Sequence, residues 1–146
     1  MSNTTDLQIV NFTVGSVDYG VPVEQVREIR EMQAVTPIPG TPDFIEGVTN
    51  LRGQVITVLN LKRRLGLASD NKGSRKIMIV EAEKATAGVV VDSVAEVSRI
   101  PLTEVERQLE TVLVNSEYII GVGKQAEKLI VILNLAKIIR NSNEPT

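Results

Sequence analysis

The sequence predicts an all-β protein made of two pseudo-symmetric, five-stranded β-barrels with short helices. Its apolar residues lie in short runs that are rich in Val and Ile and often alternate with polar residues, which is typical of strands. Short segments with Gly, Asn or Asp separate many of these runs. The same order of runs also occurs twice. Five short strands in a unit of about 70 residues favour a closed barrel, because closure removes exposed strand edges.

Two pairs of matching segments carry the repeat. FIEGVTNLRGQVITVLNLKRRL (44–65) aligns without a gap with YIIGVGKQAEKLIVILNLAKII (118–139). Upstream, DYGVPVEQVREI (18–29) aligns with TAGVVVDSVAEV (86–97). Two blocks in the same order, with Gly and Asn among the matching positions, indicate a duplicated unit.

Each half of the repeat is interpreted as one barrel within a single domain, 1–146. The N-terminal strand, 7–14, is the end strand that could pair with the other barrel instead of its own. In the first half (6–72), strands are expected near 7–14, 18–23, 26–32, 45–50 and 54–59, followed by a short helix from Leu61. In the second half (73–140), strands are expected near 76–82, 86–92, 94–100, 117–122 and 128–133, followed by a helix near 135–140.

Polar and proline-containing segments mark the boundaries of these elements. Asp18 and Asn60 stand where a turn and a helix cap are needed. Residues 36–42, TPIPGTP, predict a stiff loop, because proline cannot donate to a strand ladder. Residues 66–75 are polar and contain glycine, which predicts the linker between the halves. Residues 103–106, TEVE, have the spacing of a capping box and predict that a short helix opens there, before Leu109.

The composition bounds the class of function. The chain has 146 residues, of which 42% are hydrophobic, as expected for a folded globular protein. Sixteen Lys and Arg residues against 18 Asp and Glu residues give a formal charge of -2, so nucleic acid and anionic lipid have no general attraction for it. No apolar run has the length of a membrane span, and the polar N-terminus does not resemble a signal peptide. We expect a cytoplasmic protein.

Catalysis is disfavoured by the residue types that are missing. The chain has no Cys and no His, so it lacks the commonest general base, the commonest zinc ligand and the strongest nucleophile. Neither a dinucleotide-binding glycine motif nor a phosphate-binding loop is present. We therefore expect no catalytic residue, no metal and no cofactor. Carboxylates such as Glu24 and Asp92, at matching strand ends, keep an enzyme open as an alternative.

Arg52 is the most unusual residue of the first half. It lies in a hairpin-length break, Arg52-Gly53-Gln54, where the turn itself requires Gly, Asn or Asp and has no need of arginine. The second copy has Ala126 at this position, so the duplicated fold does not require a guanidinium there. Specialised recognition by Arg52 is one interpretation. A surface charge or an internal salt bridge is the other, and composition does not separate them.

The sequence resembles the CheW family of bacterial chemotaxis coupling proteins. The resemblance rests on FIEGVTNLRGQVITVLNL, preceded by YGVPVEQVREI and TPIPGTP, and it extends from about Gln8 to Ile139. It implies two SH3-like five-stranded barrels and a non-catalytic adaptor. The adaptor would join the cytoplasmic tips of methyl-accepting chemoreceptors to the histidine kinase CheA in signalling arrays. The regulatory domain of CheA shares the module, but 146 residues leave no room for a kinase or receiver domain, which favours the free-standing adaptor.

The resemblance also implies which residues contact the receptor, around a hydrophobic groove between the barrels. The kinase would bind at barrel ends, without assigned residues, and association with the membrane would be indirect, through the receptors. An enzyme that uses carboxylates in the cleft and a tandem-barrel nucleic-acid binder are the alternatives. The near-neutral charge and four aromatic residues disfavour the latter. The receptor-contact residues implied are Val26, Glu28, Ile29, Arg52, Gly88 and Val94.

Overall fold

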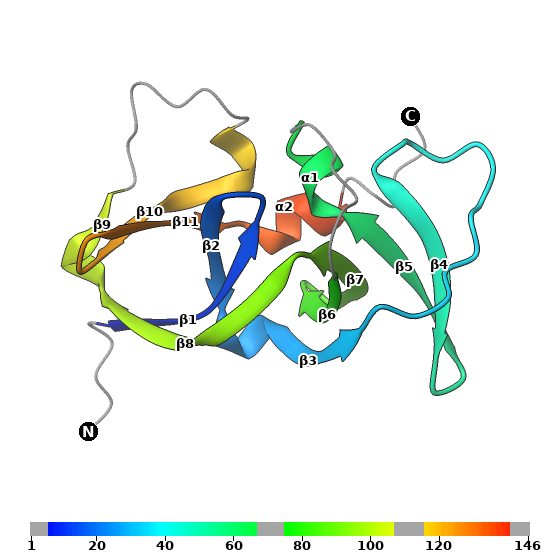
Figure 1. Cartoon of the computed structure of the whole chain (residues 1–146), viewed down its shortest axis with the longest axis horizontal. Helices are drawn as coiled ribbons and strands as arrows, with labels where there is room; N and C mark the ends of the chain where they lie inside the picture. The colour runs from blue at the N-terminus through cyan, green and yellow to red at the C-terminus, as the bar shows by residue number, and fades with distance from the viewer. Residues whose placement is uncertain (1–5, 67–74, 107–115, 141–146) are drawn as a thin grey trace.

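The computed structural model describes residues 6–66, 75–106 and 116–140, whose strands form two curled sheets side by side (Figure 1). The six-stranded sheet, called barrel A, has the order β8-β1-β2-β11-β10-β9, and the five-stranded sheet, barrel B, has the order β3-β6-β7-β5-β4. The all-β fold with two barrels is thereby confirmed.

The strands are β1 (Asp6–Val14), β2 (Val17–Pro22), β3 (Val26–Glu31), β4 (Ile45–Leu51), β5 (Gln54–Asn60), β6 (Lys76–Ala82), β7 (Ala85–Val91), β8 (Ser93–Pro101), β9 (Val105–Glu106), β10 (Ile119–Gln125) and β11 (Lys128–Leu133). The helical segments are α1 (Leu61–Arg64), α2 (Leu135–Arg140) and the 3-10 turns η1 (Val23–Gln25), η2 (Leu102–Glu104) and η3 (Ser116–Tyr118).

Each barrel contains strands from both halves of the chain. In barrel A, β1 and β2 from the first half pair with β8 and β11 from the second. In barrel B, β6 and β7 pair with β3 and β5. The expected halves, 6–72 and 73–140, therefore do not each form a barrel. We allowed for one exchanged end strand, whereas two strands cross over in each direction.

The short connections explain why the strands cross over. Asp92 alone joins β7 to β8, and a single residue cannot form a hairpin, which needs at least two. The segment between β2 and β3, η1, has the sequence Val-Glu-Gln and lacks the Gly or Asn that a tight reversal requires. Both strands therefore continue into the other barrel instead of folding back.

The largest apolar core lies between the barrels. It contains buried residues from β1 and β2 of barrel A and from β6 and β7 of barrel B, together with residues of both helices. We call it the inter-barrel core. Two smaller clusters fill the barrels themselves, one with Ile77 and Ile79 in barrel B and one with Ile9 and Ile100 in barrel A. The inter-barrel core comprises Val10, Phe12, Val14, Tyr19, Val21, Leu59, Leu61, Leu65, Met78, Val80, Ala82, Ala87, Val89, Val91, Tyr118, Leu133, Leu135, Ile138 and Ile139.

Gly47 lets the segment after β3 approach β4. Thr36 and Val48 form an isolated antiparallel bridge with hydrogen bonds of 2.8 and 2.9 Å. Gly47, with a φ of 144°, faces this segment, and a Cβ added there would lie 2.1 Å from the Thr36 carbonyl oxygen. At its repeat partner, Gly121, another segment also comes close: a Cβ added there would lie 2.7 Å from the Glu106 carbonyl oxygen. The duplicated glycine therefore serves a duplicated close contact.

The expected local signals have different outcomes. The Asn60 side chain accepts a hydrogen bond from the Arg63 N–H at 3.1 Å, which confirms the predicted cap of α1. The prediction for Asp18 was wrong, since it lies within β2. Where a short helix was predicted to open, residues 102–104 form the 3-10 turn η2, and Val105 and Glu106 pair with β10 because this long-range pairing outweighs the local capping pattern. The rest of that predicted helix, from residue 107 on, lies outside the described residues. Of the predicted linker, residues 67–74 lie outside the described residues.

The β4–β5 and β10–β11 hairpins each contain a non-glycine residue with a left-handed backbone conformation, which allows a test of stability. Arg52 has a φ of 53° and its repeat partner Ala126 a φ of 55°. Because left-handed backbone is unfavourable for residues with a Cβ, Ala126→Gly should raise the free energy of unfolding by about 1 kcal/mol. Urea unfolding measures this change. Glu127→Gly is the control, since the φ of Glu127 is not positive and glycine there should destabilise; an Ala126→Gly variant no more stable than the wild type would contradict the argument.

Candidate functional site

The candidate site begins where β3 and β8 leave the junction between the barrels. The two strands occupy equivalent positions in the repeat and run away from the junction in opposite directions, on the side of the molecule away from α1 and α2 (Figure 1). Val26 begins β3 and lies opposite Val80, and Val94 in β8 lies opposite Phe12. Both valines are half-buried and pack against the inter-barrel core.

Apolar surface continues outward from these two valines. Ile29 pairs with Met78 and Val97 pairs with Val10, so both lie on the sheet faces from which the inter-barrel core is built. Yet Ile29 is 44% exposed and Val97 is 51% exposed. A hollow of about 500 Å³ follows residues 28–33 along β3. We call Val26, Ile29, Val94 and Val97 the apolar strip.

Val97 was missed in the sequence, although a signal for it existed. In the aligned segments it stands opposite Ile29, which had been selected. An exposed aliphatic side chain kept at the same position of both copies is more informative than a single one, because isolated apolar residues on a surface are common.

Glu28 and Arg52 are brought together by the fold. The Arg52 Nη1 donates to Glu28 Oε2 at 2.7 Å and its Nη2 donates to Glu28 Oε1 at 3.1 Å, a bidentate pair. β3 and the β4–β5 hairpin stand at opposite edges of the sheet, so this pair links the two edges of barrel B. Arg30 adds a weaker contact, 3.6 Å from Glu28 Oε1. The Arg52 side chain nevertheless stays 70% exposed.

The ion pair fixes the charge of both partners. The hydrogen bond and the charge of Arg52 lower the pKa of Glu28 below its ordinary value of 4.5, and Glu28 raises the pKa of Arg52. Because the pKa of Glu28 is lowered on folding, its contribution to stability is present above the ordinary carboxyl pKa and is lost as the pH falls through the lowered one. Both groups are therefore fully charged near neutral pH.

The hairpin that carries Arg52 is held by two supporting side chains that sequence reasoning did not single out. Asn50 accepts a hydrogen bond from the Gly53 N–H at 2.8 Å, which caps the turn. Gln33 donates to Thr49 Oγ1 at 2.8 Å and to the Asn50 carbonyl at 3.2 Å, and so ties the segment after β3 to β4. Arg52 is thus presented by a supported turn.

Gly88 does not belong to the exposed site. It is buried in β7, and a Cβ there would lie 2.9 Å from Ile77 Cγ2 and 3.5 Å from Val58 Cγ2, inside barrel B. Gly20, its repeat partner, packs in the same way against Ile9 and Ile130 of barrel A. The selection of Gly88 as a contact residue is therefore corrected, since the absence of a side chain there makes room for Ile77 and the buried residue offers a partner no surface.

The carboxylates considered for catalysis have other surroundings. Asp92 Oδ2 accepts a hydrogen bond from the Gly15 N–H at 2.6 Å and lies 3.8 Å from Lys62 Nζ, so Asp92 holds the β1–β2 turn. Glu24 is exposed in η1. In the described part of the chain, no group of three or more acidic residues is arranged to hold a metal ion, and no helix is long and apolar enough to cross a membrane.

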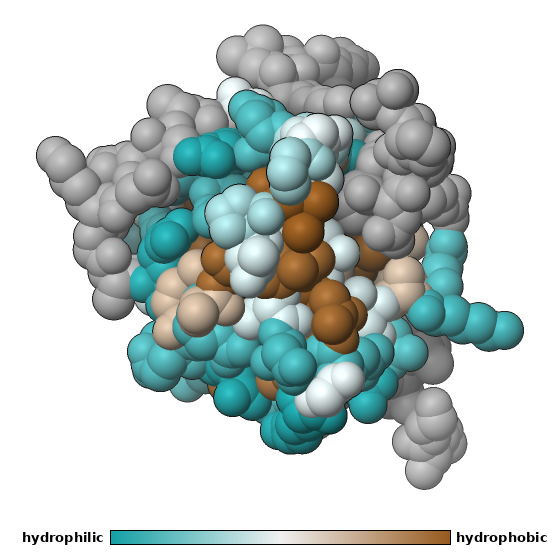
Figure 2. All heavy atoms as spheres, turned by 90° about the vertical axis from the view of Figure 1, so that its right-hand side faces the viewer, coloured by the Kyte–Doolittle hydropathy of each residue, from teal (hydrophilic) through white to brown (hydrophobic). Residues whose placement is uncertain are grey.

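A second apolar surface lies at the barrel ends. Figure 2 shows apolar residues gathered over the end of barrel B and bordered by hydrophilic ones. Val55, in β5 after the Arg52 hairpin, is 67% exposed, and its repeat partner Leu129 in barrel A is 62% exposed. A hollow of about 510 Å³ lies beside Val55; it is lined by Gln33, Ala34, Thr36, Val48, Thr49, Asn50 and Val55.

Known proteins share both the sequence pattern and the fold. Residues 8–143 match the family described as the CheW-like domain. The chemotaxis protein CheW of Helicobacter pylori is 32% identical over 140 residues, which cover 94% of this chain and 84% of that protein. FrzA of Myxococcus xanthus is 34% identical over 136 residues, covering 91% and 85%. The crystal structure of the scaffolding protein TtCheW from Thermoanaerobacter tengcongensis superimposes with a TM-score of 0.88 at 33% identity, covering 96% of this chain and 97% of that one.

Proposed function

Because this chain belongs to the CheW-like family of chemotaxis adaptor and scaffold proteins, we propose that it joins the cytoplasmic tips of methyl-accepting chemoreceptors to the histidine kinase CheA. In this proposal it acts by holding the two partners in a fixed geometry and catalyses no reaction. It works in the cytoplasm, is drawn to the membrane only through the receptors, and binds no nucleic acid.

The observation that carries the receptor assignment is the apolar strip. Ile29 and Val97 are exposed at equivalent positions on two strands that diverge from one core, with Val26 and Val94 at their inner ends. An amphipathic helix needs an extended apolar surface of this kind for its own apolar stripe, and helical segments are commonly recognised in this way. We therefore assign the helical receptor tip to the strip.

Arg52 supplies a polar contact at β3, where its partner Glu28 directly precedes Ile29 of the apolar strip. Two of its N–H groups are committed to Glu28, but the guanidinium has five donors and its side chain is mostly exposed. Glu28 holds the guanidinium in one orientation, which reduces the entropy that a partner must remove on binding. We propose that the remaining donors bind acidic or carbonyl groups of the receptor and fix its register.

We assign the kinase to the barrel ends. Val55 and Leu129 are the most exposed of the large aliphatic side chains in the described residues, and they occupy the same position in the two copies. They lie on β5 and β11, whereas the apolar strip lies on β3 and β8, and we propose that one molecule holds both partners at once. The regulatory domain of CheA is the proposed partner at these ends.

A pull-down with two baits tests this function. One bait is a receptor cytoplasmic fragment and the other is the CheA regulatory domain, and the wild type should be retained by both. Ile29→Asp and Val97→Asp should lose at least about tenfold in receptor affinity while keeping kinase binding, because a carboxylate in an apolar contact costs on the order of 1–3 kcal/mol.

Val55→Asp should show the opposite pattern: it should lose binding to the CheA regulatory domain and keep binding to the receptor fragment. Val17→Asp is the matched control, since Val17 is also an exposed valine, at 37%, but lies outside both surfaces. Failure of the wild type to bind either bait would remove the proposed function. Equal losses of receptor affinity for Ile29→Asp and Val17→Asp would contradict the assignment of the receptor to the apolar strip.

A further inference from the structure

α1 differs from its repeat partner α2 in the two residues that reach across to barrel A. The two helices align without a gap, each after an Asn cap. Lys62 of α1 stands where α2 has Ala136, and Arg64 stands where α2 has Ile138. A duplicated scaffold does not itself require these two cations, so their contacts in α1 call for a separate reason.

Arg64 contacts both barrels at once. Its guanidinium carbon lies 4.3 Å from the centre of the Phe44 ring and 4.5 Å from the centre of the Tyr118 ring. Phe44 precedes β4 of barrel B, and Tyr118 precedes β10 of barrel A. The Arg64 Nε also donates to the carbonyl of Ile138 in α2, at 3.3 Å. One side chain therefore joins the two equivalent aromatic residues and the second helix.

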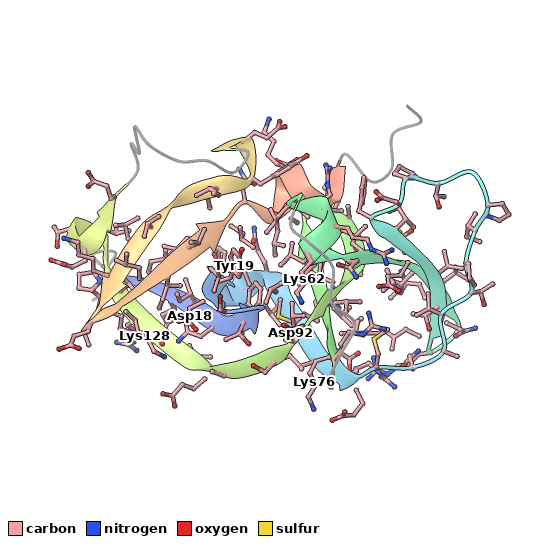
Figure 3. The ribbon with its side chains drawn as sticks, turned by 45° about the horizontal axis from the view of Figure 1, so that its top comes forward. Asp18, Tyr19, Lys62, Lys76, Asp92 and Lys128 are labelled. Atoms are coloured by element: carbon pink, nitrogen blue, oxygen red, sulfur yellow. The ribbon has the colours of Figure 1, made fainter. Side chains whose placement is uncertain are left out.

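Lys62 makes a second contact, at the residue that connects barrel B to β8 of barrel A. Its Nζ lies 3.8 Å from Asp92 Oδ2, and the Lys62 side chain is only 14% exposed. The same Asp92 oxygen accepts a hydrogen bond from the Gly15 N–H of the β1–β2 turn, and a Cβ added at Gly15 would lie 3.9 Å from Lys62 Cε. Figure 3 places Lys62 and Asp92 in the middle of the molecule, between the two sheets. α1, which follows β5 of barrel B, is thus linked to barrel A at two separate points.

The Arg64 contact is not one that stability alone would favour. Among the described residues its buried Nη2 finds no hydrogen-bond partner, and an unsatisfied buried donor costs free energy. An aliphatic residue at this place, next to two aromatic rings, would avoid that cost, as Ile138 does in α2. What arginine adds is a directional contact to both barrels, because its planar group must lie between two rings and point at one carbonyl.

We propose that α1 is a clamp in which Lys62 and Arg64 set the relative orientation of the two barrels. α1 and the apolar strip lie on opposite sides of the inter-barrel core (Figure 1). Because β3 belongs to barrel B and β8 to barrel A, a rotation of the barrels about this core changes the separation of Ile29 and Val97. The clamp therefore fixes the spacing of the strip from the far side, and this last step rests on the proposed function.

The test gives α1 the residues of α2. The variant Lys62→Ala/Arg64→Ile should fold with a melting temperature at or near that of the wild type. Residual dipolar couplings of the backbone amides should fit one alignment tensor for both sheets in the wild type. In the variant, each sheet should still fit its own tensor, but the two tensors should differ. Arg63→Lys is the matched control, since Arg63 bonds the Asp43 carbonyl beside barrel B and α2 has Lys137 there; one tensor should remain.

The possible results separate the clamp from the proposed function. A single tensor in Lys62→Ala/Arg64→Ile overturns the clamp, whatever the receptor does. If the variant unfolds, the single variant Arg64→Lys provides the measurement, because it keeps the charge and loses the planar contact; one tensor there also overturns the proposal. Where wild-type protein binds the receptor fragment, the two-tensor variant should bind it several-fold more weakly. If wild-type protein does not bind, only the proposed function fails.

Discussion

Gly47→Ala should lower the free energy of unfolding by at least about 3 kcal/mol, because two costs add at this residue. Its φ of 144° lies in a region that residues with a Cβ rarely adopt, and the new Cβ would lie 2.1 Å from the Thr36 carbonyl oxygen. Relief of the clash requires loss of the bridge between Thr36 and Val48. Urea unfolding followed by circular dichroism measures the change.

Two other glycines separate these costs. Gly40 has a φ of 82° with no atom near an added Cβ, so Gly40→Ala should lose only the conformational part, about 1 kcal/mol. Gly121 has the clash without a left-handed φ, 2.7 Å from the Glu106 carbonyl oxygen, and Gly121→Ala should fall between the other two. A Gly47→Ala variant no less stable than Gly40→Ala would show that the segment at Thr36 moves away freely.

Arg52→Ala should weaken receptor binding roughly ten- to a hundredfold while the protein melts like the wild type. The loss in binding follows from removing charge-assisted hydrogen bonds to the receptor. The stability changes little because the pair with Glu28 is solvent-exposed, and such pairs contribute little to folding. Titration calorimetry with the receptor fragment and thermal melts provide the two measurements. Arg52→Lys should restore only part of the affinity, since lysine lacks the planar fork.

The ion pair raises a second explanation, in which Arg52 acts only by holding Glu28. A double-mutant cycle with Glu28→Gln distinguishes the two, because residues that act only through each other give a double variant no worse than either single one. Because the two side chains are in contact, the losses need not add, but we expect Arg52→Ala to lower receptor affinity further in the Glu28→Gln background. A double variant that binds the receptor no more weakly than Glu28→Gln alone, or a marked fall in the melting temperature of Arg52→Ala, would assign Arg52 to the barrel instead.

Local features of this fold were predictable because their cause is local. The strands followed from alternating aliphatic residues, and the cap at Asn60 followed from its side chain and its place before Leu61. The duplication even located equivalent positions, and it would have pointed from Ile29 to Val97.

Long-range features were not predictable from the same signals. Which strand pairs with β1 depends on parts of the chain that lie far away in sequence, so the crossover of two strands in each direction was missed. The pair of Arg52 with Glu28 exists only because the barrel brings its two edges together, and a pattern of residues does not record that distance. Gly88 was misassigned because a glycine looks the same in a sequence whether it packs against Ile77 or meets a partner.

The exchange of strands determines the order in which the protein can be completed on the ribosome. Barrel B needs only the chain up to β7, so it can close while the part of the chain after β7 is still being synthesised. Barrel A cannot, because β2, near the start, pairs with β11, near the end. The first strands to emerge must therefore wait for the last one, and contacts this distant in sequence form slowly. The same molecule is thus assembled from the middle outward, and its N-terminal hairpin is the part that a chaperone would meet with its apolar face uncovered.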